Sequence, residues 1–364
     1  MDKKQKKYAL ILSGGAFLGA YQLGALNYIW ENREQITGIK DNVPFNIVSG
    51  ISVGSLNGAL VAQDKMNVLN KLWQEVAENG SKEIFTSDYI DDSGQIHLNF
   101  EALKKDLFPG FRLKAGFFIR ALGNWFLKLF GRKNLPGLLE LIIQDLSARV
   151  DKNLPQFRSL AENRPLREKL KANLQLNDFP EKCNYQTGFV SLNSGKYISV
   201  SNKNIPDDAT LINCIAASTA IPVMWAPVPQ INYQGLHKNL SDGGLKNVSP
   251  LADAVKAAKN DPDYDYRFII INCHAYTLNP MEKSSWDVLS SAARSFDIIM
   301  SEIFNNDIRE FIKKNNEAKT PDANLKKLQN FEYKLIQPPL PDLGNSLDSR
   351  KQTIEMRIQK GTKQ

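Results

Sequence analysis

Residues 45–54 read Phe45-Asn46-Ile47-Val48-Ser49-Gly50-Ile51-Ser52-Val53-Gly54, and this stretch decides the fold class. The apolar residues 45–48 predict a short buried strand, and residues 53–63 have the composition of a helix. Between them, Gly50-x-Ser52-x-Gly54 predicts a sharp strand-to-helix turn that directs a serine hydroxyl toward a helix N-terminus. The motif alone also fits a small-residue turn, but the strand before it and the helix after it favour a nucleophile elbow.

The chain on either side of this turn repeats the same alternation. Residues 8–12 predict a first strand, Ser13-Gly14-Gly15 predicts a turn, and residues 16–30 predict a helix. Further strands are expected at 185–192, 196–200 and 267–272, and further helices at 211–220, 251–259, 286–313 and 351–360. Residues 98–177 show no clear strand pattern, and prolines break their helical stretches, so we expect an inserted helical region there. Alternating strands and helices predict an α/β fold whose neighbouring strands run parallel.

The composition excludes several classes of protein. With 364 residues, 42% hydrophobic and 23% charged, the chain is an ordinary globular sequence and not a disordered, collagen-like or disulfide-scaffold one. The three cysteines (Cys183, Cys214 and Cys273) are widely spaced and expected to be reduced. The three histidines have no metal-ligand spacing, so neither a metal nor another cofactor is predicted. No apolar run reaches the length of a membrane-spanning helix.

The glycine-rich turn after the first strand is a candidate anion site. Small residues let backbone N–H groups face a phosphate or an oxyanion at a helix N-terminus. A dinucleotide fingerprint would require a glycine where Ala16 stands, and a phosphate-binding P-loop would end in Gly-Lys-Ser/Thr. The simplest interpretation is an oxyanion hole made by the amides of Gly14, Gly15 and Ala16 with that of Val53, which follows the candidate nucleophile.

A third motif, Ser241-Asp242-Gly243-Gly244, would by itself most often be a turn. The ordered set of a glycine-rich turn, Gly-x-Ser-x-Gly and a late Asp-Gly-Gly after residues 216–222 resembles the patatin-like phospholipase family. The resemblance extends from about Tyr8 to about Gly361. It implies an α/β, three-layer fold with a central mostly parallel sheet, helices on both faces and a helical insert. The domain would span residues 7–361, with the insert at about 98–177 and a tail at 362–364.

The resemblance also implies roles for individual residues. Ser52 would be the nucleophile and Asp242 the base of a Ser-Asp dyad, without a metal. The motif glycines are Gly19, Gly50, Gly54, Gly243 and Gly244. The activity implied is that of a lipid acyl hydrolase of phospholipase A or lysophospholipase type. A catalytically weak or silent membrane-binding relative and a transacylase with the same dyad stay open as alternatives.

Two features bear on that activity. The family's loop has a third glycine and a basic residue where this chain has Ala16 and Leu18, so the chain lacks a cation beside the intermediate. His274 follows a predicted strand, and the order Ser52, Asp242, His274 also matches the triad of α/β-hydrolases. The early position of the elbow and the first-turn oxyanion loop favour the dyad.

The net charge of +7 has a specific location. Residues 101–171 contain 15 Lys and Arg against 7 Asp and Glu, so the rest of the chain is close to neutral. Within them, residues 111–133 have no acidic residue and combine an apolar face with cations, as an interfacial helix or a lid does. The residues expected to contact a membrane or cover the site are Phe117, Phe118, Arg120, Trp125, Phe126 and Lys128. A helix packed on the body with a solvated basic side is the alternative.

The expected partners follow from this charge distribution and from the family resemblance. The charge distribution favours an anionic membrane surface, and no nucleic-acid motif accompanies the basic residues. The resemblance to the patatin-like family implies a phospholipid or lysophospholipid substrate. The expected location is the cytoplasm with peripheral membrane association, with export from a bacterial host left open. The oligomeric state is not predicted.

Overall fold

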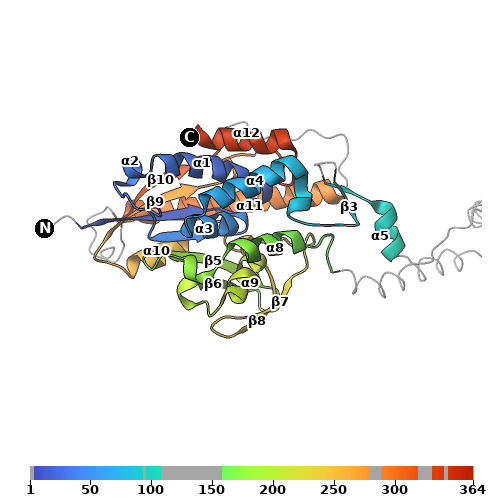
Figure 1. Cartoon of the computed structure of the whole chain (residues 1–364), viewed down its shortest axis with the longest axis horizontal. Coiled ribbons are helices and arrows are strands. Elements are labelled where there is room, and N and C mark those ends of the chain that lie inside the picture. Colours follow the sequence, from blue (N-terminus) through green and yellow to red (C-terminus); the bar gives the residue numbers. More distant parts are fainter. Residues whose placement is uncertain are drawn as a thin grey trace, which may run out of the picture.

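The centre of the molecule is a single sheet with strand order β10-β9-β1-β2-β5-β8-β7, and β6 pairs with β5 (Figure 1). The computed structural model describes residues 4–92, 96–107, 158–278, 280, 288–318, 330–339 and 343–363. The strands of the sheet are β1 (Lys6–Leu12), β2 (Ile47–Gly50), β5 (Asn184–Ser191), β6 (Tyr197–Ser201), β7 (Val228–Asn232), β8 (Leu236–Asp242), β9 (Asp265–Ile271) and β10 (Glu332–Ile336).

Five neighbouring strands of this sheet run parallel. Strand β1 pairs with β2 on one side and with β9 on the other, so that Leu10 lies opposite both Val48 and Ile269. Strands β10 and β5 continue the parallel part, whereas β6, β7 and β8 are antiparallel to their neighbours. The prediction of a mostly parallel central sheet is therefore confirmed.

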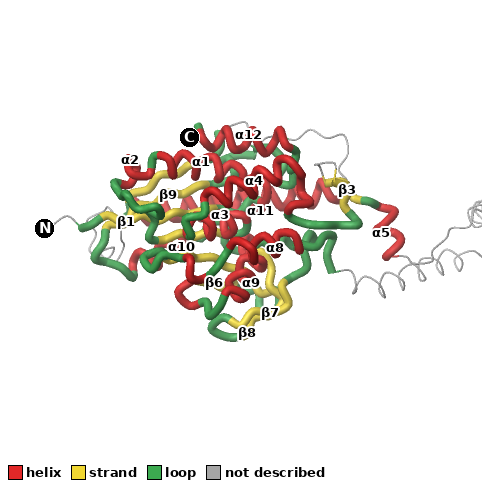
Figure 2. The backbone as a smooth tube through the Cα atoms, in the orientation of Figure 1, coloured by secondary structure: helices red, strands yellow, loops and turns green. Residues whose placement is uncertain are grey.

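Helices cover both faces of the sheet (Figure 2). The described helices of the body are α1 (Gly19–Glu31), α2 (Arg33–Thr37), α3 (Val53–Ala62), α4 (Met66–Asn79), α8 (Arg164–Asn173), α9 (Asp208–Ser218), α10 (Leu251–Lys259), α11 (Val288–Glu317) and α12 (Lys351–Thr362). Helix α5 (Phe100–Leu107) lies apart from the sheet. Short 3-10 helices are η1 (Ala16–Leu18), η2 (Gly80–Glu83), η4 (Leu176–Asp178), η5 (Asn202–Asn204) and η6 (Gly243–Leu245).

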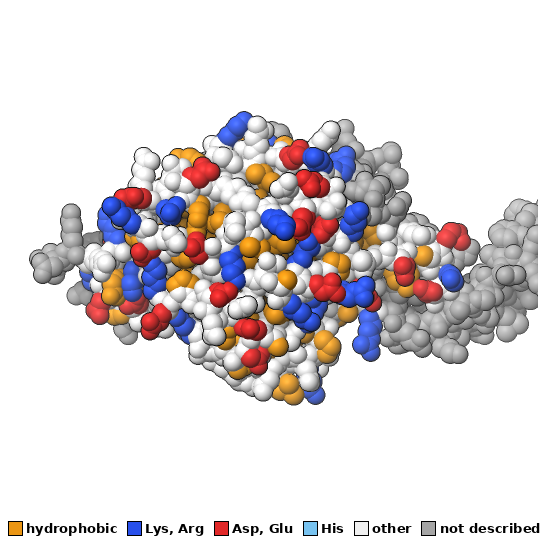
Figure 3. Space-filling model, viewed as in Figure 1, with side chains coloured by type: hydrophobic (Ala, Val, Ile, Leu, Met, Phe, Trp, Pro, Cys, Tyr) orange, Lys and Arg blue, Asp and Glu red, His pale blue; other side chains and the backbone are white. Residues whose placement is uncertain are grey.

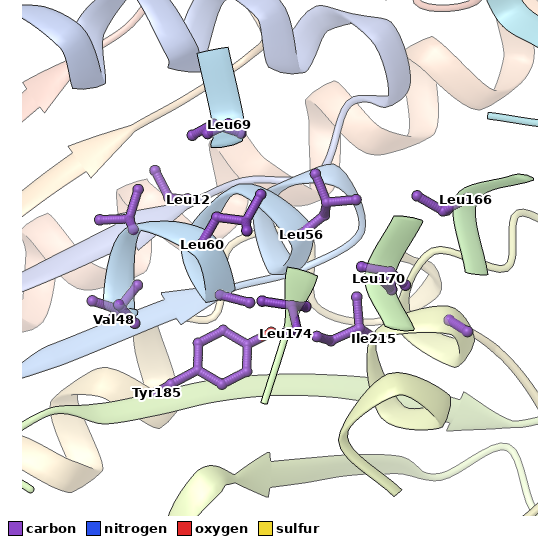
Figure 4. Close-up of a cluster of buried hydrophobic side chains, with 14 of the residues drawn as sticks. Leu12, Val48, Leu56, Leu60, Leu69, Leu166, Leu170, Leu174, Tyr185 and Ile215 are labelled. Atoms are coloured by element: carbon purple, nitrogen blue, oxygen red, sulfur yellow. The ribbon is translucent and has the colours of Figure 1, made fainter. Parts of the chain in front are cut away.

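The alternation of side chains along β1 explains the three layers. Tyr8, Leu10 and Leu12 join the larger buried cluster, which includes residues of α1, α3, α4, α8, α9 and α12. Ala9 and Ile11 point to the other face and join a second cluster with residues of α10 and α11. Because both faces of the strand are buried, its sequence is apolar throughout, as in parallel sheets. Figure 4 shows the larger cluster where β1, β2, α3, α8 and β5 contribute side chains.

The structure adds elements that the sequence did not predict. Strands β7, β8 and β10, helix α4, and a small hairpin of β3 (Ile90–Asp92) and β4 (Ile96–Leu98) were not expected. Strand β10 lies at the end of the strand order, and its first three residues are exposed, so it lacks an apolar pattern. The predicted strands and helices elsewhere are present, with ends shifted by a few residues.

The predicted helical insert is described only at its two ends. Helix α5 lies at the start and α8 near the end of residues 98–177. Phe117, Phe118, Arg120, Trp125, Phe126 and Lys128 lie outside the described residues. Helix α8 belongs to the body, because Leu166 and Leu170 are buried in the larger cluster and Ala161, just before the helix, bridges to Trp225.

Charged side chains of both signs lie on the described surface. On the face in Figure 3, the described basic and acidic side chains are interspersed. Eight of the 15 basic residues at 101–171 lie outside the described ranges. Cys183, Cys214 and Cys273 are buried and free, as expected. None of the described helices is long and apolar enough to cross a membrane.

Helix α12 packs directly against α1 (Figure 1). Gly24 of α1 lies against the backbone carbonyl of Ile358, and Gly361 of α12 lies against that of Tyr21. A side chain at either glycine would push the helices apart, so the close approach requires these two small residues. The C-terminal helix is therefore tightly packed against the body and not loosely attached to its surface.

Candidate active site

Ser52 occupies the sharp turn between β2 and α3. Its backbone angles, φ 55 and ψ −127, lie in a region that L residues rarely adopt. Gly50 and Gly54 make the turn sterically feasible, because Gly50 contacts the backbone of Gly54, and Gly54 contacts the carbonyl oxygens that end β1. The geometry is that of a nucleophile elbow, in which the strained backbone of the serine places its side chain at the end of the sheet.

A chain of buried hydroxyl groups supports this turn from below. The Ser52 N–H donates a hydrogen bond to Ser218 Oγ at 3.1 Å. Ser218 Oγ lies 3.1 Å from Thr187 Oγ1, which lies 2.7 Å from Ser55 Oγ. Ser55 Oγ in turn lies 2.8 Å from the hydroxyl of Tyr185. These supporting side chains are fully buried and come from α3, β5 and α9, so no local sequence pattern predicts that they meet.

Asp242 reaches the same end of the sheet although its strand is antiparallel. Strand β8 pairs with only the last three residues of β5, and Asp242 lies opposite Phe189. The strand therefore stops near the level where the parallel strand β2 ends. The carbonyl of Ala220 accepts hydrogen bonds from the Asp242 N–H at 2.9 Å and from Ser241 Oγ at 2.7 Å. This contact joins the segment 216–222 to the Asp-Gly-Gly motif.

The carboxyl group of Asp242 is buried beside Ser52. Asp242 is 0% exposed, and its Oδ1 accepts a hydrogen bond from the Gly244 N–H at 2.7 Å. Burial raises its pKa to about 7, against the opposing effects of the Ser52 hydroxyl and the Gly244 amide. Oδ2 is buried and makes no hydrogen bond to any described residue, so the contact with Ser52 is looser than a formed hydrogen bond. A carboxyl group with this pKa can accept a proton near neutral pH.

The predicted oxyanion donors need one correction. Gly14 is not available as a donor, because its N–H bonds the Val248 carbonyl at 3.0 Å. The amides of Gly15, Ala16 and Val53 make no hydrogen bond within the described parts of the chain. Gly15 is the N-cap of η1, Ala16 is its first residue and Val53 begins α3, so these three amides lie at helix starts, where N–H groups have no helical partner. They are the amides that can bind an oxyanion.

The two departures from the family's loop have different structural effects. Ala16 adopts φ 48, the left-handed region that favours glycine. Its amide is retained at the cost of a strained backbone. Leu18 is 3% exposed and packs in the hydrophobic core, so this position provides no charge to the site.

His274 lies apart from the hydrogen bonds that the described residues make to Asp242. It is buried at the end of β9, where its N–H bonds Asn272 Oδ1 at 3.0 Å. Among the described residues, neither oxygen of Asp242 bonds an imidazole.

Ser52 opens onto an apolar pocket. Ala16 and Val53, two of the three unpaired amide positions, also line it. The other lining residues are Phe17, Leu56, Leu72, Trp73, Val76, Ile84, Phe85, Leu166, Lys169, Thr219, Ile221, Met224, Trp225 and Leu347. The arrangement can hold a hydrocarbon chain with its carboxyl carbon near the serine. Within the described ranges, no cluster of His, Cys, Asp and Glu could hold a metal ion.

The fold and the site together define an α/β protein with the features of an ester hydrolase acting on apolar substrates. A model of the patatin-like phospholipase family matches residues 10–255, a span that contains Gly15, Ser52 and Asp242. The chain therefore belongs to the patatin-like phospholipase family. This membership supports lipid acyl hydrolase activity in general.

No match is found among curated protein sequences. Among solved structures, the crystal structure of VipD from Legionella pneumophila aligns with 99% of this chain and 67% of VipD, at a TM-score of 0.32 and 15% sequence identity. The family assignment rests on the match over residues 10–255.

Proposed function

We propose that this protein is a phospholipase A or lysophospholipase that cleaves acyl esters with a Ser52-Asp242 dyad. The observation that carries the proposal is the position of the strained Ser52 between a buried carboxyl group of pKa about 7 and an apolar pocket. An ester with a long acyl chain is the substrate that combines a reactive carbonyl with an apolar tail.

The proposed reaction proceeds in two halves. Ser52 Oγ attacks the ester carbonyl carbon while Asp242 accepts the hydroxyl proton, and the carbonyl oxygen becomes an oxyanion held by the amides of Gly15, Ala16 and Val53. The carbon–oxygen bond to the alcohol then breaks, and Asp242 returns the proton to the departing oxygen. A water molecule attacks the acyl-serine in the same way and releases the fatty acid and free Ser52.

A fluorophosphonate probe tests this proposal. Such probes modify activated serines covalently, so we expect labelling of the wild-type protein and none of Ser52→Ala. Asp242→Asn should label slowly, and His274→Ala should label at close to the wild-type rate. Absence of labelling in lipid-containing buffer would contradict the proposal, and a loss of about a thousandfold in His274→Ala would replace the dyad by a triad.

Product analysis separates hydrolysis from acyl transfer. With a phospholipid substrate we expect free fatty acid as the main product. If an added alcohol or lysophospholipid takes most of the acyl groups instead, the same dyad serves a transacylase. This outcome would correct the acceptor and leave the assignment of Ser52 intact.

We also propose peripheral association with anionic membranes through residues 111–133. The support is sequence-based, because this segment combines aromatic residues and cations without an acidic residue. Deletion of these residues should reduce sedimentation with vesicles that contain phosphatidylglycerol, while vesicles of phosphatidylcholine alone should bind neither protein well. Unchanged binding to the anionic vesicles would refute this role.

A further inference from the structure

We propose that Leu72 and Lys169 form a partition that limits the length of the acyl chain in the pocket beside Ser52. This inference rests on the proposed function, because it assigns the acyl chain of the substrate to that pocket. Leu72 and Lys169 line the part of the pocket next to the groove between α4 and α8.

The two residues lie between two cavities. The pocket that contains Ser52 is narrow, with a volume of about 80 Å³, and its walls are almost entirely apolar. An outer groove of about 660 Å³, which several charged side chains line, lies between α4 and α8. Leu72 of α4 and Lys169 of α8 are the residues that line both cavities. An acyl chain that extends from the pocket toward this groove would therefore pass between them.

Ion pairs hold Lys169 in this position. Its ammonium group lies 2.7 Å from a Glu83 carboxylate oxygen and also pairs with Glu75. Both glutamates line the outer groove and not the pocket, so the charge lies on the groove side and the aliphatic stem faces the pocket. The pairs join α8 to α4 and η2, and all three side chains are 21–28% exposed.

Lys169 and Glu83 are both charged at neutral pH. Burial by itself would lower the pKa of Lys169, but hydrogen bonds to Glu75 and Glu83 outweigh it and raise that pKa. The hydrogen bond from Lys169 lowers the pKa of Glu83. A hydrocarbon chain that reached the outer groove would separate these ions from one another, which is unfavourable in a partly desolvated site. The partition thus resists long chains by bulk and by charge.

The inference predicts how substrate preference changes when the wall is removed. For p-nitrophenyl esters with butyryl, octanoyl, dodecanoyl and palmitoyl chains, Leu72→Ala should shift the optimum of kcat/KM to longer chains. Each methylene that gains burial is expected to add about fourfold to kcat/KM. Lys169→Ala, which removes the opposite half of the partition, should shift the optimum in the same direction.

Val68→Ala is the matched control. Val68 lies one turn before Leu72 on the same helix and is also half-buried. It lines the outer groove but not the pocket that contains Ser52. It should leave the chain-length profile unchanged. An unchanged profile in both Leu72→Ala and Lys169→Ala, with the enzymes still active and folded by thermal unfolding, would overturn the inference.

A binding measurement separates this inference from the proposed function. In a Ser52→Ala background, calorimetric titration with octanoate, dodecanoate and palmitate reports on the pocket without catalysis. A shift toward longer fatty acids upon Leu72→Ala, together with no hydrolysis by the wild-type protein, would refute the proposed activity but support the partition. Equal affinity changes for all chain lengths would refute the partition even if the wild-type protein hydrolyses esters.

Discussion

The backbone N–H of Ser52 donates a hydrogen bond to the hydroxyl of Ser218, 3.1 Å away at the end of α9. Ser218 is fully buried, and Ser52 is the residue with the strained φ of 55. A conformation of this kind costs about 1–3 kcal/mol and persists where its surroundings fix it. The bond thus links the conformation of the candidate nucleophile to a helix that belongs to neither β2 nor α3.

Ser218→Ala tests this link. The substitution leaves the Ser52 N–H buried without an acceptor, at a cost of about 1–3 kcal/mol. We expect kcat for ester hydrolysis to fall about 10- to 100-fold while KM changes little, because the defect concerns the attacking group and not the pocket. Fluorophosphonate labelling should slow in parallel.

Ser249→Ala provides the comparison. Ser249 is 1% exposed, and its hydroxyl bonds none of the residues that the structure describes, so its removal deletes a buried hydroxyl without breaking any of the described bonds. We expect wild-type kcat from this variant. A normal kcat in Ser218→Ala as well would show that the bond does not position Ser52.

Ala16 gives a prediction of opposite sign. Its φ of 48 is unfavourable for alanine, and a left-handed conformation costs about 1–2 kcal/mol for a residue with a Cβ atom. Ala16→Gly should therefore raise the free energy of unfolding by about 1 kcal/mol and keep the amide that the oxyanion needs. Urea unfolding and esterase rates measured on the same preparation provide the test.

The same substitution at Ala20 controls for the loss of a methyl group. Ala20 lies within α1 and is fully buried, so Ala20→Gly should lower the free energy of unfolding by about 1 kcal/mol or more. If both glycine variants were destabilised to a similar extent, strain at Ala16 would not be significant.

The sequence predicted the parts of the fold and site that depend on local patterns. Strand β1 is apolar throughout because both of its faces are buried, and the glycines around Ser52 reflect a close approach of the backbone. Strand β8 was missed because most of its first residues are exposed or half-buried and polar. A strand or helix can be predicted from sequence when the hydrophobicity of its own residues follows their burial. In β8 only the last three residues are buried, so the strand has no such pattern.

The remaining errors concern partners far away in the chain. Gly14 looked like an oxyanion donor because its motif is local, but its N–H is used by the carbonyl of Val248. Ser218 and Thr187 were not predicted at all, since serine and threonine carry no pattern that would place them beneath an elbow. Hydrogen-bond partners of this kind follow from topology and not from spacing.

Arg357 lies outside residues 10–255, the segment that the family model matches, and we expect it to stabilise the fold. Its side chain is 0% exposed and donates hydrogen bonds to the carbonyls of Leu343, Asn345 and Asp348 at 3.1, 2.6 and 2.7 Å. The same loop bonds η1, through the Phe17 N–H and the Ser346 carbonyl at 3.0 Å. Because an ammonium group cannot make this set of planar bonds, Arg357→Lys should lower the free energy of unfolding by about 3 kcal/mol or more.

The neighbouring Arg350 is the control for this variant. Its side chain is 52% exposed and pairs with Asp348 at 2.6 Å. Because half of this guanidinium is in water and a lysine can still pair with the Asp348 carboxylate, Arg350→Lys should lower the unfolding free energy by less than Arg357→Lys does. Since Leu347 lines the pocket beside Ser52, Arg357→Lys should also lower kcat/KM. Equal stability of the two variants in urea titrations would contradict the role assigned to the buried guanidinium.

The raised pKa of Asp242 predicts a conflict between activity and stability. The folded protein holds a proton on this carboxyl up to a pH of about 7, whereas an unfolded aspartate loses it near 3.8. Stability from this group is therefore complete below about pH 4 and lost as the pH rises through 7. Hydrolysis needs the ionised form, so kcat/KM should rise over the upper part of the same range.

Asp242→Asn should separate the two effects. The amide stays neutral, so above pH 7 the variant should be inactive yet more stable than the wild-type protein, by on the order of 3 kcal/mol. Burial also raises the pKa values of Asp297 and Asp307, to about 6 and about 7. The free energy of unfolding of Asp242→Asn should therefore still fall as the pH rises, but by less than that of the wild-type protein. Ser52→Ala, inactive but with the carboxyl intact, should keep the full pH dependence. Unfolding in urea at pH 5 and pH 8 distinguishes the three proteins, and an Asp242→Asn variant no more stable than wild type at pH 8 would contradict a buried, ionised base.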